Sequence, residues 1–76
     1  MRIELIEELK NISILCVEDE FGIRQSIVNT LKYYFKDVYE ASNGNEAYEL
    51  YEYYKPKIVI TDIQMPKVNG LAISLN

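Results

Sequence analysis

Three short segments of the chain have the apolar pattern of β-strands. Residues 12–17 form a nearly continuous apolar run, which is typical of a parallel strand covered on both faces. Residues 37–41 alternate in polarity, and residues 58–61 are all strong β-formers. We therefore predict strands over these three segments.

The stretches between these strands have helical spacing instead. Within residues 21–35, apolar side chains recur every fourth position from Ile23 to Phe35. After Asn43-Gly44, which we interpret as a strand-to-helix loop with Asn45 as the helix cap, apolar residues again share one face up to Tyr54. Lys55-Pro56-Lys57 should end this second helix. Residues 2–10 predict a further short amphipathic helix, which Asn11 can end.

The predicted order is helix, then β-α-β-α-β, then a short final segment, LAISLN, which is too brief for a full helix. Strands that alternate with helices of this length indicate an α/β fold with a parallel sheet and right-handed crossovers. With 76 residues the chain holds one small domain.

Composition narrows the classes of partner. The formal net charge is −4, and an acidic chain repels phosphate backbones, so we expect no direct nucleic-acid binding. No apolar run approaches the roughly 20 residues that span a bilayer, so we expect no membrane partner. The single cysteine, Cys16, lies inside an apolar run and should be a buried core thiol. These features favour a cytoplasmic location.

Acidic residues follow two of the predicted strands. Glu18-Asp19-Glu20 follows the first strand, and Asp62 follows the third. Ligands of open parallel sheets bind outside the carboxyl ends of the strands, so these carboxylates would converge if the two strands are neighbours. Their mutual repulsion calls for a cation, and Mg²⁺ suits hard oxygen ligands. One carboxylate could instead act as a nucleophile toward a phosphoryl group.

A simpler interpretation is that these acids are helix N-terminal residues favoured by the helix dipole. It applies best to Glu20 and least well to Asp62, which precedes a Met-Pro turn rather than a helix.

Taken together, the motifs resemble the receiver domain of two-component response regulators. VEDE at 17–20, NGNEA at 43–47 and TDIQMPKVNG at 61–70 have the order and spacing of that family. The resemblance implies a flavodoxin-like fold with strand order 2-1-3-4-5, here incomplete, with three strands in the order 2-1-3. Residues 1–11 would form an N-terminal helical extension, and residues 12–76 a truncated receiver domain.

The resemblance also implies the role of each site residue. Asp62 matches the residue that accepts a phosphoryl group from a histidine kinase or phosphotransfer protein. Asp19 matches the principal Mg²⁺ ligand, and Glu18 the second acid of the pair, which often acts through water. Gln64 would give its backbone carbonyl to the metal. The chain would then be a signalling module in a phosphorelay and not an enzyme.

Parts of the family pattern have no counterpart in the sequence. The family carries a Ser or Thr at the end of strand four and a Lys at the end of strand five, and neither can be assigned here. Without further strands, the third strand would be an open edge that invites pairing. We therefore predict a homodimer joined antiparallel through the two third strands. The alternative function is a fragment that self-associates in this way and lacks phosphotransfer switching.

An enzyme is the least favoured reading. Phosphatases of the haloacid dehalogenase type also use a strand-end Asp as nucleophile, but they need a second Asp two positions later. This chain has Gln64 there.

Overall fold

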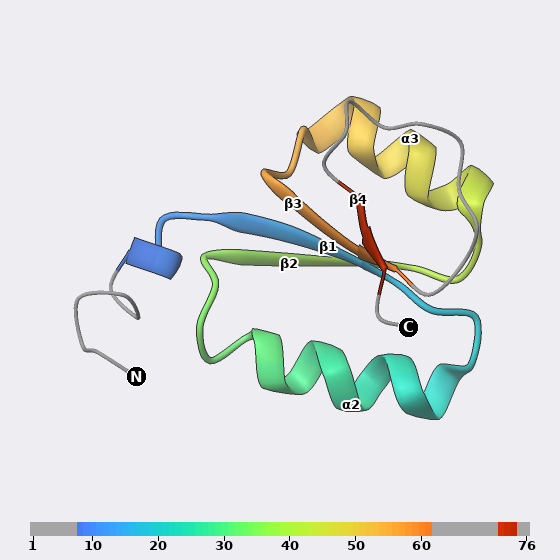
Figure 1. Ribbon diagram of the computed structural model, residues 1–76, viewed down its shortest axis with the longest axis horizontal. Helices are drawn as coiled ribbons and strands as arrows, with labels where there is room; N and C mark the ends of the chain where they lie inside the picture. The colour runs from blue at the N-terminus through green and yellow to red at the C-terminus, as the bar shows by residue number, and fades with distance from the viewer. Residues whose placement is uncertain (1–7, 62–71, 75–76) are drawn as a thin grey trace.

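The computed structural model describes residues 8–61 and the backbone of residues 72–74. This part of the chain comprises a four-stranded sheet, helices α2 and α3, and a helical turn at residues 8–9 (Figure 1). This turn lies within the predicted helix over residues 2–10, most of which falls outside the described residues. The elements are β1 (Ser13–Val17), α2 (Phe21–Leu31), β2 (Asp37–Ala41), α3 (Gly44–Tyr54), β3 (Ile58–Thr61) and β4 (Ala72–Ser74). No helix within the described part is long and apolar enough to cross a membrane.

All the strand pairs are parallel, and the order is β2-β1-β3-β4. The predicted strand order 2-1-3 and the flavodoxin-like α/β arrangement are therefore confirmed. Helix α2 covers one face of the sheet and α3 covers the other (Figure 1). Strand β1 lies between β2 and β3 and pairs with both, so its register sets the position of each of these strands.

The short final segment of the chain adds a strand that the sequence analysis did not predict. Residues 72–74 form β4, which pairs with β3 from Val59↔Ala72 to Thr61↔Ser74. The third strand is thus paired on both sides, because β4 takes up hydrogen-bonding groups that an edge would leave open. The prediction that the third strand is an open edge is therefore wrong. The predicted homodimer depended on that open edge, so it loses its structural basis.

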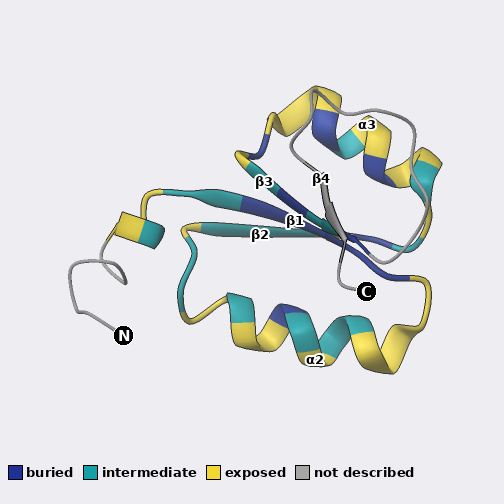
Figure 2. Cartoon of the chain, viewed as in Figure 1, coloured by how far each residue is buried: buried dark blue, intermediate teal, exposed yellow. Residues whose placement is uncertain are grey.

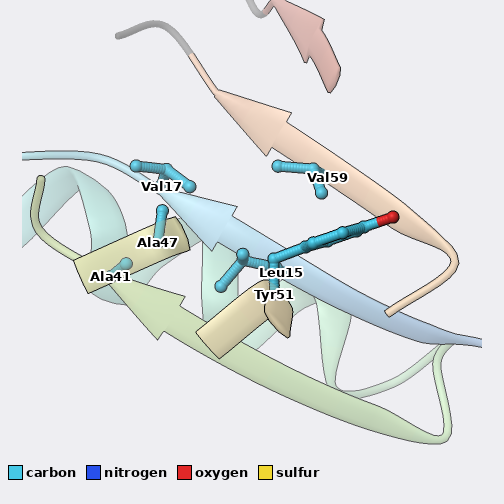
Figure 3. Packing of buried hydrophobic residues seen from close by; sticks show 6 residues of the cluster. All are labelled: Leu15, Val17, Ala41, Ala47, Tyr51 and Val59. Atoms are coloured by element: carbon cyan, nitrogen blue, oxygen red, sulfur yellow. The ribbon is translucent and has the colours of Figure 1, made fainter. Parts of the chain in front are cut away.

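The main core lies between the sheet and α3. Side chains of β1, β2 and β3 meet two residues of α3 in one buried cluster (Figure 3): Leu15, Val17, Ala41, Ala47, Tyr51 and Val59. At alternate positions of β1, Ile14 and Cys16 are just as buried on the α2 side. The predicted burial of Cys16 is confirmed, and β1 is buried along most of its length (Figure 2).

Helix α2 is shorter than its apolar spacing predicts. It ends at Leu31, and tight turns follow, with Tyr33 N–H donating to Thr30 O at 3.1 Å. The N–H of Lys36 then donates to Ile12 O at 2.9 Å, which ties the chain back to the start of β1. The helix stops early because the chain must return to the sheet before β2. Its apolar stripe is also only partly covered, since Ile23 is 50% exposed.

The cap of helix α3 lies two residues before the predicted one, and the helix begins at Gly44. Asn43, not Asn45, is the N-cap, and its side chain accepts a hydrogen bond from Glu46 N–H at 2.8 Å. Glu46 in turn accepts one from Ser42 N–H at 2.6 Å, so the two side chains satisfy amides at the helix start. The predicted end is confirmed: Lys55 adopts the left-handed conformation that closes the helix.

Aromatic side chains join β2 to the end of α3. The rings of Tyr39 and Tyr54 stack with their centroids 4.2 Å apart, and Tyr53 meets Tyr54 edge-on at 4.7 Å. Desolvation in this contact raises the pKa of the Tyr39 phenol, and the nearby Asp37 carboxylate adds to the rise. Most of the tyrosines thus lie on the surface, whereas Tyr51 belongs to the core.

Replacing Leu15 by Ala should lower the free energy of unfolding by about 2–5 kcal/mol, because it leaves a cavity in the main core. Urea denaturation followed by circular dichroism measures the change. As a control, Tyr33→Ala removes a side chain that is 76% exposed and should cost no more than about 0.5 kcal/mol. Equal losses in the two variants would contradict this assignment of the core.

The two asparagines at the start of α3 should respond in opposite ways. Asn43→Ala removes the cap and should cost about 1 kcal/mol of unfolding free energy. Asn45→Ala places a better helix former inside the first turn, so it should be neutral or slightly stabilising. The same urea titration compares them, and a larger loss for Asn45→Ala would restore the cap predicted from the sequence.

Candidate functional site

The candidate site lies where β1 and β3 end side by side. The register pairs Val17 with Thr61, so the next residue along each strand is an acid. Because the strands are parallel, their carboxyl ends lie at the same edge of the sheet (Figure 1). Two of the predicted site residues, Asp62 and Gln64, lie outside the described residues. The structure therefore brings together Glu18 and Asp19 and the end of the strand that leads to Asp62.

Glu18 is held firmly at the end of β1. Glu18 is only 3% exposed, which is unusual for a glutamate. Its backbone N–H donates to Ala41 O at 3.0 Å, and its Oε2 accepts a hydrogen bond from Glu20 N–H at 2.9 Å. A buried carboxylate is costly unless it is hydrogen-bonded, so these contacts fix the carboxylate at the sheet edge.

Asp19, by contrast, is exposed. An exposed carboxylate next to a buried one provides two kinds of oxygen ligand. Asp19 is open to an incoming cation and its waters, whereas Glu18 is already oriented by the backbone. The roles of the two acids as metal ligands stay predictions.

Glu20 has a structural role. It is the N-cap of α2, in extended backbone conformation, and its Oε1 accepts a hydrogen bond from Gly22 N–H at 2.8 Å. The helix-end interpretation is therefore confirmed for this residue. The carboxylate also lies at the positive end of the helix dipole, where negative charge is favoured.

Sequence reasoning missed Arg24. Its Nη1 donates to the backbone oxygen of Glu18 at 2.7 Å, and its Nε lies 3.0 Å from Glu40 Oε1 on β2. The guanidinium also lies over the Phe21 ring, 5.4 Å from its centroid. The sequence feature that could have indicated this contact is the position of Arg24, one helical turn after the Glu20 cap. Helical side chains lie over the preceding turn, which here is the acidic segment. This guanidinium places a positive charge beside the acidic loop.

The ligand chemistry of the acids fits Mg²⁺. Carboxylate and carbonyl oxygens with room for water are the ligands that this ion prefers. Within the described ranges, no group of three or more His, Cys, Asp or Glu side chains is placed to hold a metal ion. The predicted set takes its third carboxylate from Asp62, outside these ranges, so only two of its carboxylates, those of Glu18 and Asp19, belong to described residues.

The fourth strand adds a hydroxyl residue near this edge. Strand β4 ends at Ser74, which is in register with Thr61 at the end of β3. The sequence interpretation assigned no hydroxyl residue to the end of a fourth strand, because it predicted no strand after the third. The three residues of β4 carry too little pattern to predict a strand.

A cavity lies at the opposite end of the sheet. Its volume is about 400 Å³, and none of the predicted site residues lines it. The lining residues are Asn11, Ile12, Ser13, Tyr51, Lys55, Pro56 and Lys57. The acidic site therefore lies at the carboxyl ends of the strands, whereas this cavity lies at their amino ends.

Comparison with known proteins agrees with the fold and the motifs. The model of the response regulator receiver domain family matches residues 14–75. An uncharacterized response regulatory protein of Staphylococcus epidermidis is 39% identical over 61 residues, which cover 76% of this chain and 24% of that protein. The transcriptional regulatory protein HptR of Staphylococcus aureus is 38% identical with the same coverage. No solved structure matches the chain significantly.

The chain belongs to the response regulator receiver domain family. Members of this family are signalling modules of two-component phosphorelays. The chain spans about a quarter of the length of the curated relatives it matches.

The cap assignment of Glu20 predicts a difference between two substitutions. Glu20→Ala removes the acceptor for Gly22 N–H and should cost about 0.5–2 kcal/mol of unfolding free energy. Glu20→Gln keeps an acceptor oxygen while it removes the charge, so it should retain most of that stability. Chemical denaturation of both variants measures the difference. An equal loss of unfolding free energy in the two variants would show that Glu20 acts through its charge and not as a cap.

Proposed function

We propose that the chain is a phosphorelay receiver module that accepts a phosphoryl group on Asp62. The donor is a histidine kinase or a histidine phosphotransfer protein. The residues that would hold Mg²⁺ are Glu18, Asp19 and Asp62, together with the backbone carbonyl of Gln64. This proposal extends the family assignment to particular residues.

The observation that best supports the proposal is the register of β1 with β3. Val17 pairs with Thr61, so the acid pair and Asp62 each follow directly after a matched position. The burial and hydrogen bonding of Glu18 support it further, because a carboxylate held at the sheet edge is suited to bind a metal or to orient its water.

The proposed step transfers the phosphoryl group from nitrogen to oxygen. An oxygen of the Asp62 carboxylate forms the new bond to phosphorus as the phosphorus–nitrogen bond of the phosphohistidine donor breaks. The imidazole leaves with the electron pair and takes up a proton from solvent. When bound, Mg²⁺ supplies positive charge that offsets the charge on the transferring phosphoryl oxygens. Glu18 and Asp19 would hold that charge beside the end of β3.

Incubation of the chain with MgCl₂ and acetyl phosphate tests the proposal, with intact mass spectrometry as the measurement. We expect the gain of one phosphoryl group, which hydroxylamine then removes, as it should for an acyl phosphate. Asp62→Asn should abolish the gain because it removes the nucleophile. Asp19→Asn should reduce it strongly because it removes a metal ligand, and a chelator should do the same to the unmodified chain.

Circular dichroism on each sample shows that the protein is folded. A folded chain that gains no phosphoryl group would overturn the proposed function. A gain that survives Asp62→Asn would place the acceptor at another residue.

A further inference from the structure

Arg24 joins three elements at the candidate site. Its side chain is only 13% exposed, although arginine is usually a surface residue. One guanidinium nitrogen bonds to the carbonyl of Glu18 at the end of β1, and another bonds to Glu40 on β2. The backbone N–H of Arg24 donates to Glu20 O at 2.9 Å. Residues 18 and 20 are thus both bonded to one residue of α2, on either side of Asp19.

We propose that Arg24 is a positioning residue for the Mg²⁺ site. It holds the carbonyl of Glu18, and so sets the direction in which the Glu18-Asp19 backbone leaves the sheet and presents its two carboxylates. This inference rests on the proposed function, since it concerns the same metal site.

The guanidinium suits this task because of its shape. Its nitrogens lie in one plane and donate in fixed directions, so the carbonyl of Glu18 and the carboxylate of Glu40 are held at a set spacing. Glu40 orients the guanidinium and is itself held by Gln25, whose Nε2 donates to the same Oε1 at 2.7 Å. A lysine would keep the charge but would lose this two-point attachment.

A positioning role and a purely electrostatic role of Arg24 predict opposite changes in Mg²⁺ affinity when Arg24 is removed. A cation close to a metal site repels Mg²⁺, so an Arg24 that acted only through its charge would weaken Mg²⁺ binding. Its removal would then strengthen binding. If Arg24 instead positions the acid pair, its removal weakens Mg²⁺ binding even though one positive charge is lost.

The test is a titration of the ¹⁵N-labelled 76-residue chain with MgCl₂, followed through the amide signal of Glu20. This amide is a direct reporter because it donates to Glu18 Oε2. We expect Arg24→Ala and Arg24→Lys to raise the Kd for Mg²⁺ by about tenfold, as for other residues that orient metal ligands. Lys32→Ala is the matched control. It removes one exposed positive charge at the far end of α2, away from Glu18 and Glu40, so the Kd should not change.

Thermal unfolding without Mg²⁺ is recorded for each variant, because a role in stability alone would lower the melting temperature without changing the Kd of the folded protein. If Arg24→Ala does not fold, Arg24→Lys and Glu40→Ala decide, and the latter should weaken Mg²⁺ binding in the same direction. An unchanged Kd in Arg24→Lys, or a lower Kd in Arg24→Ala, would overturn the positioning role alone. Absence of Mg²⁺ binding by the unmodified chain would overturn the proposed metal site and this inference with it.

Discussion

The candidate site depends on the parallel register between β1 and β3. This pairing sets Val17 opposite Thr61, and so it decides which residues leave the sheet together. In a strand, a shift of one residue moves every side chain to the opposite face. The same shift would take Leu15 and Val17 out of the cluster with α3 and separate the acids that follow the two strands. The apolar core and the placement of the acids are therefore two consequences of one register.

The apolar core enforces this register. Leu15 and Val17 lie on the α3 side of β1, next to Val59 of β3, and all three are fully buried. The alternate residues Ile14 and Cys16 are buried on the other side, so β1 has apolar partners on both faces. In another register, some of these apolar side chains would lose the buried contacts that they make here. The position of the acids is thus set by the packing of the residues that precede them along the two strands.

Charge at the end of β1 is distributed so that the fold tolerates it. Glu18 is buried but accepts an amide hydrogen bond, Asp19 is exposed, and Glu20 caps a helix. Arg24 brings a guanidinium to the carbonyl of Glu18. Each acid therefore has a different environment, although the three are adjacent in sequence. Of these, Glu18 and Asp19 are the two that we propose as metal ligands, whereas the carboxylate of Glu20 caps α2.

Much of this arrangement follows from the sequence, because β1, β2 and β3 carry distinct apolar patterns and the acids follow directly after them. The parts that do not follow are local or short. Asn43 and Asn45 are both good caps, and only the hydrogen bond to Glu46 distinguishes them. Strand β4 has three residues, too few for a periodic pattern. The contacts of Arg24 join residues far apart in sequence, so no local pattern predicts them.

The central claim is that the ends of β1 and β3 form one metal site, and paramagnetic relaxation by Mn²⁺, used as a probe in place of Mg²⁺, tests it most directly. We predict that low Mn²⁺ concentrations broaden the amide signals of Glu18-Asp19-Glu20 and of Thr61 together. Signals of Ser13 and Ile58, at the opposite ends of the same strands, should stay sharp, and excess Mg²⁺ should reverse the broadening. Broadening at the end of only one strand, or spread evenly over the acidic surface, would contradict the account.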